Sequence, residues 1–202
     1  MYTLYFLPGA CSLATHVMAR ELGLPIELVD KRGVADFSRI NPVGTVPVLV
    51  NGDRVLREGA AAMIHLLEAA DSPLLPRSGP ARDAAIDAIM FANATVHPAY
   101  GRLFFLAKSM AAGPAKAQAM AAAADAVSVL WATVNTRLGE HIFLGGSEPT
   151  AADVMLTVYA RWNAQFPVTI ELGEAVKRMT AAVMARPSFQ AGLAEEQARA
   201  VA

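Results

Sequence analysis

The sequence predicts an α/β domain followed by an all-α domain. Three observations support this assignment. Short β-rich runs alternate with helical patterns up to about residue 70. A stretch rich in proline and glycine, Ser72–Pro80, then has the composition of a linker. After this stretch the patterns are helical. We therefore expect domains at residues 1–76 and 81–202.

The first domain is expected to follow the order β-α-β-loop-β-β-α. Asn51-Gly52-Asp53, between two apolar runs, is typical of a β-hairpin turn. The chain is too short here for a doubly wound dinucleotide fold, and it lacks the GxGxxG motif. The expected strands are Tyr2–Leu7, Ile26–Asp30, Val46–Val50 and Arg54–Leu56, and the expected helices are Ser12–Glu21 and Gly59–Ala70.

The second domain is expected to be a set of helices. Thr150 and Asp153 have the spacing of a capping box, which marks a helix start and is a folding element. Arg186-Pro187-Ser188 ends the last long helix, and a short terminal helix follows. The expected long helices are Arg82–Ala112 with an interruption at Pro98, Ala115–Leu138, Thr150–Phe166 and Glu171–Ala185.

Composition excludes several classes of protein. A formal net charge of -1 argues against nucleic-acid binding, which normally needs a basic face. Hydrophobic residues make up 54% of the chain, enough for a substantial core, but no uncharged apolar run of about 18 residues predicts a membrane span. The N-terminus lacks the basic segment of a signal peptide. The single cysteine fits a reducing compartment, so we expect a cytoplasmic protein.

Cys11 is the only cysteine, and it lies where the first strand turns into the first helix. A thiol in the first turn faces unsatisfied backbone N–H groups and the positive end of the helix dipole, which favour the thiolate. We therefore expect a lowered pKa. The alternative is that Cys11 is a small buried apolar residue.

Three segments resemble the cytosolic glutathione S-transferases. Pro8–Leu13 is similar to the cysteine-containing bacterial beta class. Asn41–Leu49 resembles the family's N-P-x-G-x-V-P-x-L segment, and Leu56–Ala61 resembles its L-x-E-G/S-x-A-I segment. The resemblance covers nearly the whole chain. It implies a thioredoxin-like N-terminal domain that binds glutathione and an all-helical C-terminal domain that binds an electrophile.

The resemblance also implies roles for four residues of the first domain. The peptide bond between Val46 and Pro47 would be cis, and the Val46 backbone would pair with glutathione in the manner of an added strand. An ordinary trans-proline at a strand start is the alternative. Glu58 and the N–H of Gly59 would bind the γ-glutamyl ammonium and carboxylate. Glu58 could instead only stabilise its own helix.

In the second domain, Val96-His97-x-x-Tyr100 resembles the beta-class segment whose histidine approaches the cysteine. A histidine on an apolar helix stripe is, alternatively, a core residue. Pro98 is a departure, since beta-class members commonly have a lysine there, and we expect it to kink the helix at His97. The expected walls of the electrophile pocket are Tyr100, Phe104, Phe105, Tyr159 and Trp162.

The leading hypothesis is a glutathione transferase that conjugates glutathione to small hydrophobic electrophiles, a reaction of detoxification. Glutathione would be a co-substrate, and the spacing of the histidines and the cysteine indicates no metal site. Two alternatives are a non-catalytic binding protein and thiol–disulfide exchange through Cys11, with a mixed disulfide to glutathione. The resemblance further implies a homodimer.

Overall fold

The computed structural model describes residues 1–200. It separates into two compact units, one formed by residues 1–89 together with the segment that begins at Met184, and the other by residues 90–183. The boundaries 1–76 and 81–202 that the linker indicates remain a prediction.

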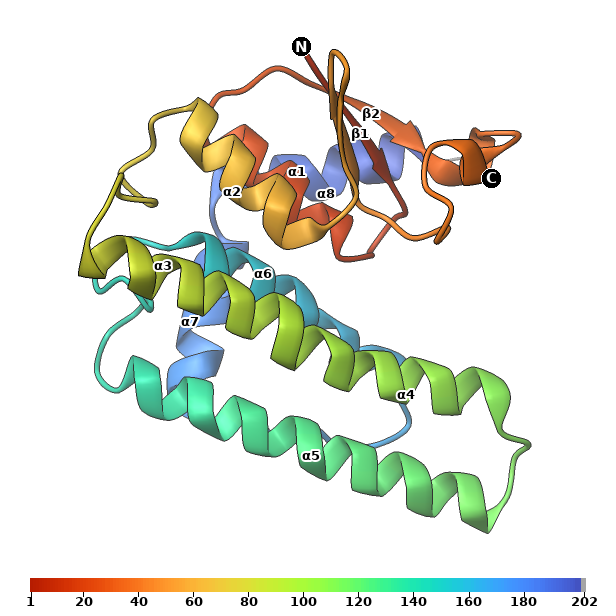
Figure 1. Ribbon diagram of the computed structural model, residues 1–202. Helices are drawn as coiled ribbons and strands as arrows, with labels where there is room; N and C mark the ends of the chain where they lie inside the picture. The colour runs from red at the N-terminus through yellow and green to blue at the C-terminus, as the bar shows by residue number, and fades with distance from the viewer. Residues whose placement is uncertain (201–202) are drawn as a thin grey trace. The chain divides into compact units, whose positions relative to one another are not determined.

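The first unit contains a four-stranded sheet in the order β2-β1-β3-β4 (Figure 1). Strands β1 and β2 are parallel, whereas β3 pairs antiparallel with both β1 and β4. The alternation of buried residues along β1 places Leu4 and Phe6 in the core beneath the sheet. The strands are β1 (Tyr2–Phe6), β2 (Ile26–Asp30), β3 (Val48–Asn51) and β4 (Arg54–Leu56).

Three helices of the first unit accompany this sheet. They are α1 (Ser12–Glu21), α2 (Gly59–Ala69) and α8 (Pro187–Arg199). Helix α1 packs against β1 and also contacts both α2 and α8. The last helix, α8, therefore packs on α1, the helix that follows Cys11. Two short 3-10 turns, Lys31–Gly33 and Phe37–Arg39, occupy the loop between β2 and β3.

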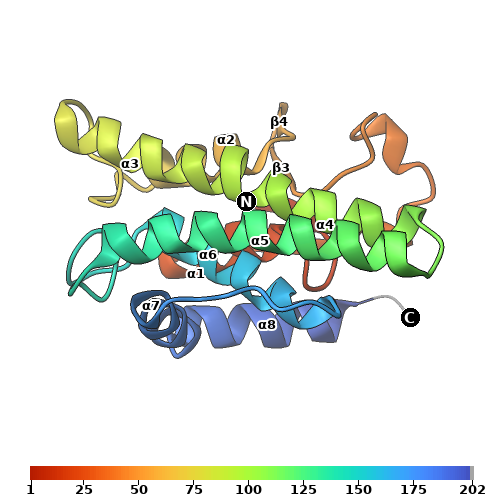
Figure 2. The same cartoon turned by 90° about the horizontal axis from the view of Figure 1, so that it is seen from below.

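Helices make up the second unit (Figure 2). Helix α3 (Pro80–Met90) belongs to the first unit up to Ile89. It leads into a π-helical segment, Phe91–Val96, which continues as α4 (His97–Ser109) in the second unit. Helix α5 (Pro114–Leu138) lies beside α4. Helix α6 (Ala151–Ala160), the 3-10 segment Arg161–Gln165 and α7 (Glu174–Met184) complete the unit.

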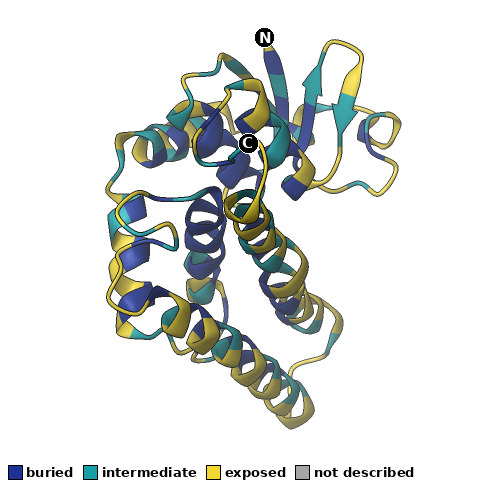
Figure 3. Ribbon diagram, turned by 60° about the vertical axis from the view of Figure 1, so that its left-hand side comes forward, coloured by how far each residue is buried: buried dark blue, intermediate teal, exposed yellow. Residues whose placement is uncertain are grey.

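Helix α5 is buried along one stripe only. Its buried residues recur with spacings of four and three, which is the period of a helix face that packs on one neighbour. Figure 3 shows much of the rest of this helix as exposed. Those buried residues are Met120, Ala124, Val127, Trp131, Val134 and Leu138.

By length and composition, α5 is the one helix in the described part of the chain that could cross a membrane. In its most apolar 18-residue window, 28% of the residues are buried inside the protein. A single helix of this kind is weak evidence for a span, because core helices pass the same test. The expectation that no uncharged apolar run of about 18 residues occurs still holds for α5, because Asp125 interrupts its apolar stretch.

Two expected elements have bounds that differ from the prediction for a local physical reason. Strand β3 begins at Val48, not at Val46, because Pro47 has no N–H to donate to a ladder. The helix expected over Thr150–Phe166 leaves α-geometry at Ala160. Phe166 precedes Pro167 and is extended, as residues before proline usually are, so the preceding turn tightens to a 3-10 helix.

Pro98 does not break its helix, which corrects the expected kink at His97. His97 keeps helical angles, φ -56° and ψ -49°, and α4 begins with proline in its first turn. The helix is continuous at this point, because the His97 N–H donates to the Ala92 carbonyl in the π-helical pattern. The wider π-helical turn accommodates a proline that has no N–H to donate. The adaptation occurs upstream, where the π-helical segment replaces regular α-helix.

Candidate functional site

Cys11 lies at the N-cap of α1, after a turn that contains Gly9 at φ +73°. Glycine adopts this left-handed conformation without steric cost. The Cys11 thiol donates a hydrogen bond to the carbonyl of Val46, with 3.2 Å between Sγ and the oxygen. The structure thus brings together two residues that are 35 positions apart in the chain.

The pKa of Cys11 is raised, not lowered as expected from its position. Burial is the main cause and lifts the pKa from 9.0 to about 11. The backbone N–H groups of Cys11 and Ser12 act in the expected direction, but the negative charges of Glu196 and Glu58 add to the effect of burial. At neutral pH Cys11 is therefore a thiol and can donate a hydrogen bond.

Val46 and Pro47 are joined by a cis peptide bond, as the resemblance implies. The residues before them form a loop that its own side chains hold in place. Asn41 is buried, and its side-chain amide donates to the Thr45 carbonyl at 2.9 Å. The Lys31 ammonium donates to the carbonyl of Gly44. This loop sets where the Val46 carbonyl lies.

Glu58 is the N-cap residue of α2, with extended φ and ψ of -110° and 131°. Its carbonyl accepts the N–H of Ala62, but its side chain makes no capping hydrogen bond. The carboxylate is exposed. In its alternative role, Glu58 would therefore stabilise its own helix through its charge and not through a capping hydrogen bond.

His97 lies in the second unit, where its ring packs among aromatic side chains. It stacks on Tyr159, with 5.1 Å between ring centroids and an interplanar angle of 16°, and lies 5.4 Å from the Trp162 ring. Burial lowers the pKa of His97. The imidazole is neutral at pH 7, so one of its nitrogens is a hydrogen-bond acceptor.

Four of the aromatic residues expected to line a pocket form one cluster, and most of it is buried. Tyr100, Tyr159 and Trp162 are buried, whereas Phe104 is 38% exposed. Phe104 contacts both Trp162 and Phe166 edge-on. Phe105, another expected wall residue, is 67% exposed. Within the cluster, Phe104 offers the exposed apolar surface, and the buried rings form the layer behind it.

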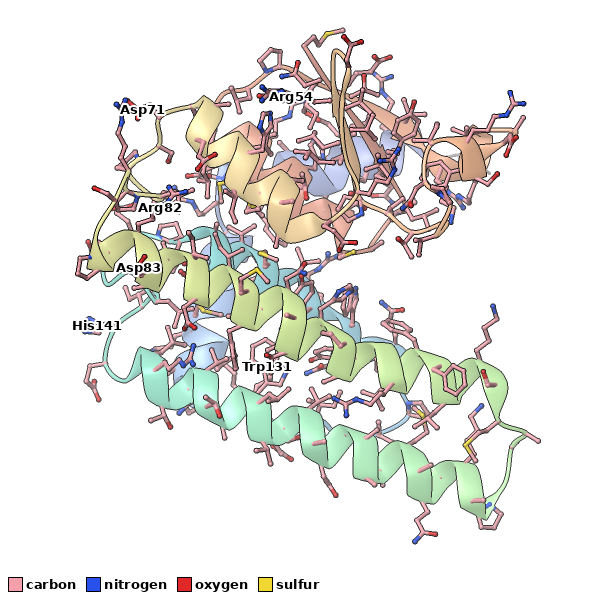
Figure 4. The ribbon with its side chains drawn as sticks, viewed as in Figure 1. Arg54, Asp71, Arg82, Asp83, Trp131 and His141 are labelled. Atoms are coloured by element: carbon pink, nitrogen blue, oxygen red, sulfur yellow. The ribbon has the colours of Figure 1, made fainter. Side chains whose placement is uncertain are left out.

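A hydrogen-bond chain that the sequence analysis missed supports this cluster. Figure 4 shows Trp131 on α5 pointing toward α4. Its indole N–H donates to the Tyr100 hydroxyl at 2.8 Å, and that hydroxyl donates to the side chain of Asn163. The spacing of the buried stripe on α5 is the signal that could have indicated Trp131 as a core residue.

Within residues 1–200, no group of three or more His, Cys, Asp or Glu side chains is arranged to hold a metal ion. Five expected site residues lie in the first unit, namely Cys11, Val46, Pro47, Glu58 and Gly59, whereas His97 and the aromatic cluster lie in the second unit. Glu58 is linked to Cys11 through its charge, and Val46 through a hydrogen bond.

Comparison with known proteins decides the family. The profile described as "Glutathione S-transferase, N-terminal domain" matches residues 9–70. Glutathione S-transferase GST-4.5 of Xanthomonas campestris is 32% identical over 199 residues, which cover 96% of this chain and 98% of that protein. The chain belongs to the glutathione S-transferase family. This family consists of transferases, and the resemblance stated from the motifs is confirmed.

Solved structures of the family have the same fold. The chain matches the bacterial beta-class glutathione S-transferase of Sphingomonas chungbukensis with a TM-score of 0.82 and 28% identity, over 96% of this chain and 98% of that one. A sphingomonad glutathione S-transferase complexed with glutathione matches with a TM-score of 0.83 and 28% identity over the same shares. The predicted thioredoxin-like domain followed by a helical domain is confirmed.

Proposed function

We propose that this glutathione S-transferase conjugates the thiol of glutathione to small hydrophobic electrophiles. One observation carries the proposal: the Val46–Pro47 cis segment lies against Cys11, 3.2 Å from carbonyl to thiol, in a chain that belongs to this family. A relative that aligns over 96% of this chain and 98% of its own was solved complexed with glutathione.

Each group of the first unit has a function in this proposal. The Val46 backbone pairs with the cysteinyl part of glutathione as an added strand would. The Glu58 carboxylate, which is not engaged in capping α2, accepts hydrogen bonds from the γ-glutamyl ammonium. The N–H groups at the start of α2, beginning at Gly59, bind the neighbouring carboxylate.

The reaction is a nucleophilic displacement or addition by sulfur. The glutathione thiol loses its proton to a base, and its sulfur then bonds to the electrophilic carbon. In a displacement a leaving group departs with its electron pair; in an addition the electron pair of the double bond moves to the neighbouring carbon, which takes up a proton. Cys11, with its raised pKa, is not the attacking group. When glutathione pairs with the Val46 backbone, the Cys11 S–H turns from the Val46 carbonyl to donate a hydrogen bond to the reacting sulfur. Neutral His97 is the proposed proton acceptor.

The electrophile is proposed to lie on the aromatic cluster of the second unit. Phe104 supplies the exposed apolar surface, with Trp162, Tyr159 and Tyr100 behind it. As the resemblance implies, we also propose a homodimer. The raised pKa of Cys11 counts against the alternative of thiol–disulfide exchange, because the thiolate is the attacking species in that chemistry.

Titration with glutathione tests the proposal. A ligand that binds only the native state raises the melting temperature, so we expect a rise that increases with glutathione concentration. Glu58→Gln should weaken this rise, whereas Glu27→Gln, an exposed carboxylate on β2, serves as the matched control and should not.

Turnover with an activated aryl chloride then separates an enzyme from a binding protein. Conjugation above the uncatalysed rate supports a transferase, and a thermal shift without conjugation supports the non-catalytic alternative. Absence of any thermal shift at millimolar glutathione would contradict the proposal.

A further inference from the structure

Two adjacent glutamates near the end of α8 have different surroundings. Glu195 is partly exposed and pairs with two residues of α1: its carboxylate lies 3.0 Å from His16 Nε2 and also pairs with Arg20. Glu196 is 2% exposed. Burying a carboxylate is costly unless hydrogen bonds compensate it, so the place of Glu196 requires an explanation.

Glu196 reaches the loop that carries Cys11. Its Oε2 accepts the backbone N–H of Gly9, with 3.2 Å between the two atoms, although 187 positions separate these residues. Gly9 is the left-handed residue of the turn between β1 and α1. A carboxylate from the last helix thus contacts the turn that places Cys11 at the start of α1.

Helix α8 is held so that Glu196 occupies this position. Near its start, Ser188 and the preceding Arg186 both bond to Glu21 of α1. In its middle, Gly192 lets the two helices approach closely, because a Cβ there would lie 3.0 Å from the Val17 side chain and 3.5 Å from that of Leu13. These contacts define the register of α8 on α1.

We propose that Glu196 is a positioning residue for the thiol site, through which the C-terminal helix holds the Gly9 turn that places Cys11 at the start of α1. A buried carboxylate bonded to this turn also disfavours a negative charge on the nearby sulfur. The carboxylates whose charge acts on Cys11 are Glu196 from α8 and Glu58 from the start of α2. Both disfavour the thiolate. Glu58 is exposed and screened by solvent, whereas Glu196 is buried.

As long as Cys11 is a thiol, it can donate a hydrogen bond. A thiol donates its proton, here to the Val46 carbonyl, whereas a thiolate would repel a second negative sulfur. This part of the inference rests on the proposed function. The effect of Glu196 on Cys11 itself does not depend on the proposed function, because it is measured without glutathione.

Alkylation of Cys11 by iodoacetamide from pH 7 to pH 12, a range that passes the pKa of about 11, is the test. A shift of the pKa raises the rate below it and leaves the plateau above it unchanged. Cys11 is the only cysteine, so the rate reports on this thiol alone. Glu196→Gln keeps the shape and a hydrogen-bond acceptor but removes the charge. Glu195→Gln is the matched control on the same helix. We expect Glu196→Gln to shift the pH profile to lower pH, with about three- to tenfold faster alkylation at pH 8, since one pKa unit is a tenfold change in thiolate.

The shape of the profile separates the two roles that Glu196 could have. A variant that only loosens the turn raises the rate by the same factor at every pH. Superimposable profiles for Glu196→Gln and wild type, or a uniform increase, would overturn the inference. Amide exchange at Gly9 supplies a second measurement: we expect faster exchange in Glu196→Ala than in Glu196→Gln, and equal rates would contradict the role of the hydrogen bond.

Discussion

At the scale of single residues, the ionisation of Cys11 is decided by burial and not by its place at a helix start. The N-terminal N–H groups lower the pKa, as expected, but removal of the thiol from water raises it more. The nearby carboxylates act in the same direction as burial. The residue is thus suited to donate a hydrogen bond at neutral pH.

Alkylation of Cys11 should consequently be slow. With a pKa of about 11 in place of 9.0, the thiolate fraction at pH 8 is lower by about 100-fold. We expect iodoacetamide to react about 100-fold more slowly with the folded protein than with the protein unfolded in urea. Equal alkylation rates in the folded and the unfolded protein would contradict the raised pKa of Cys11.

His97 is expected to affect turnover more than folding. If its neutral ring accepts the thiol proton, His97→Gln should lower kcat by about 10²–10⁴-fold, the usual worth of general acid–base help. His65→Gln, on α2 in the first unit, is the control. A folded His97→Gln protein with unchanged kcat would assign His97 to the aromatic core alone.

At the scale of elements, distant side chains decide where helices begin. The sequence predicts a helix from Glu171, but α7 starts at Glu174. Asn135, on α5, accepts the N–H of Ala175 at 3.0 Å and that of Val176 at 3.4 Å. Gly173 precedes the helix, and a Cβ there would lie 2.1 Å from the Asn135 carboxamide. This cap from another helix leaves no local sequence signal.

Asn135→Ala should therefore destabilise the protein by about 1 kcal/mol, the usual loss when a capping side chain is removed. Urea unfolding measures the change. Asn135→Asp retains an acceptor oxygen and should recover most of the stability. If the alanine and aspartate variants are equally stable, the cap on α7 contributes nothing to folding.

At the scale of the whole molecule, the raised pKa values of buried groups link stability to alkaline pH. Burial raises the pKa of Cys11 to about 11 and raises that of Tyr100 as well. In the unfolded chain both groups ionise at lower pH than in the folded protein. The stability that each group contributes is therefore fully present at pH values below its pKa in the unfolded chain. It is lost as the pH rises toward the pKa of the group in the folded protein.

The free energy of unfolding should fall as pH rises from 9 to 11. The contribution of Cys11 over this window is about 2–3 kcal/mol, because its pKa moves from 9.0 to about 11. Urea unfolding at several pH values measures the slope. Cys11→Ser removes the thiol and should give a shallower decline, whereas an unchanged slope would contradict the raised pKa.

A homodimer is the prediction at the largest scale. Most of the helix α5 surface outside its buried stripe is exposed despite its apolar composition, and exposed apolar helix faces are typical of subunit contacts. Sedimentation at micromolar concentration should give twice the mass of 21.3 kDa. A monomeric mass at that concentration would contradict the prediction.

The sequence by itself determined the fold class, most element boundaries and the family. Turn chemistry, hairpin signals and helical periodicity are local, and the motifs around Cys11, Pro47 and Glu58 are contiguous segments. Such features need no knowledge of distant contacts. The capping box at Thr150 and Asp153 is likewise local, and both of its hydrogen bonds are present.

Only the tertiary structure decided the protonation of Cys11, the start of α7 and the link between α8 and the Gly9 turn. Each depends on groups far apart in the chain: Glu196 and Gly9 are separated by 187 positions, and Asn135 and Ala175 by 40. Burial and electrostatic fields arise from packing, which short sequence patterns do not encode. The thiol at a helix start is thus uncharged because the fold surrounds it, and not because of its position in the sequence.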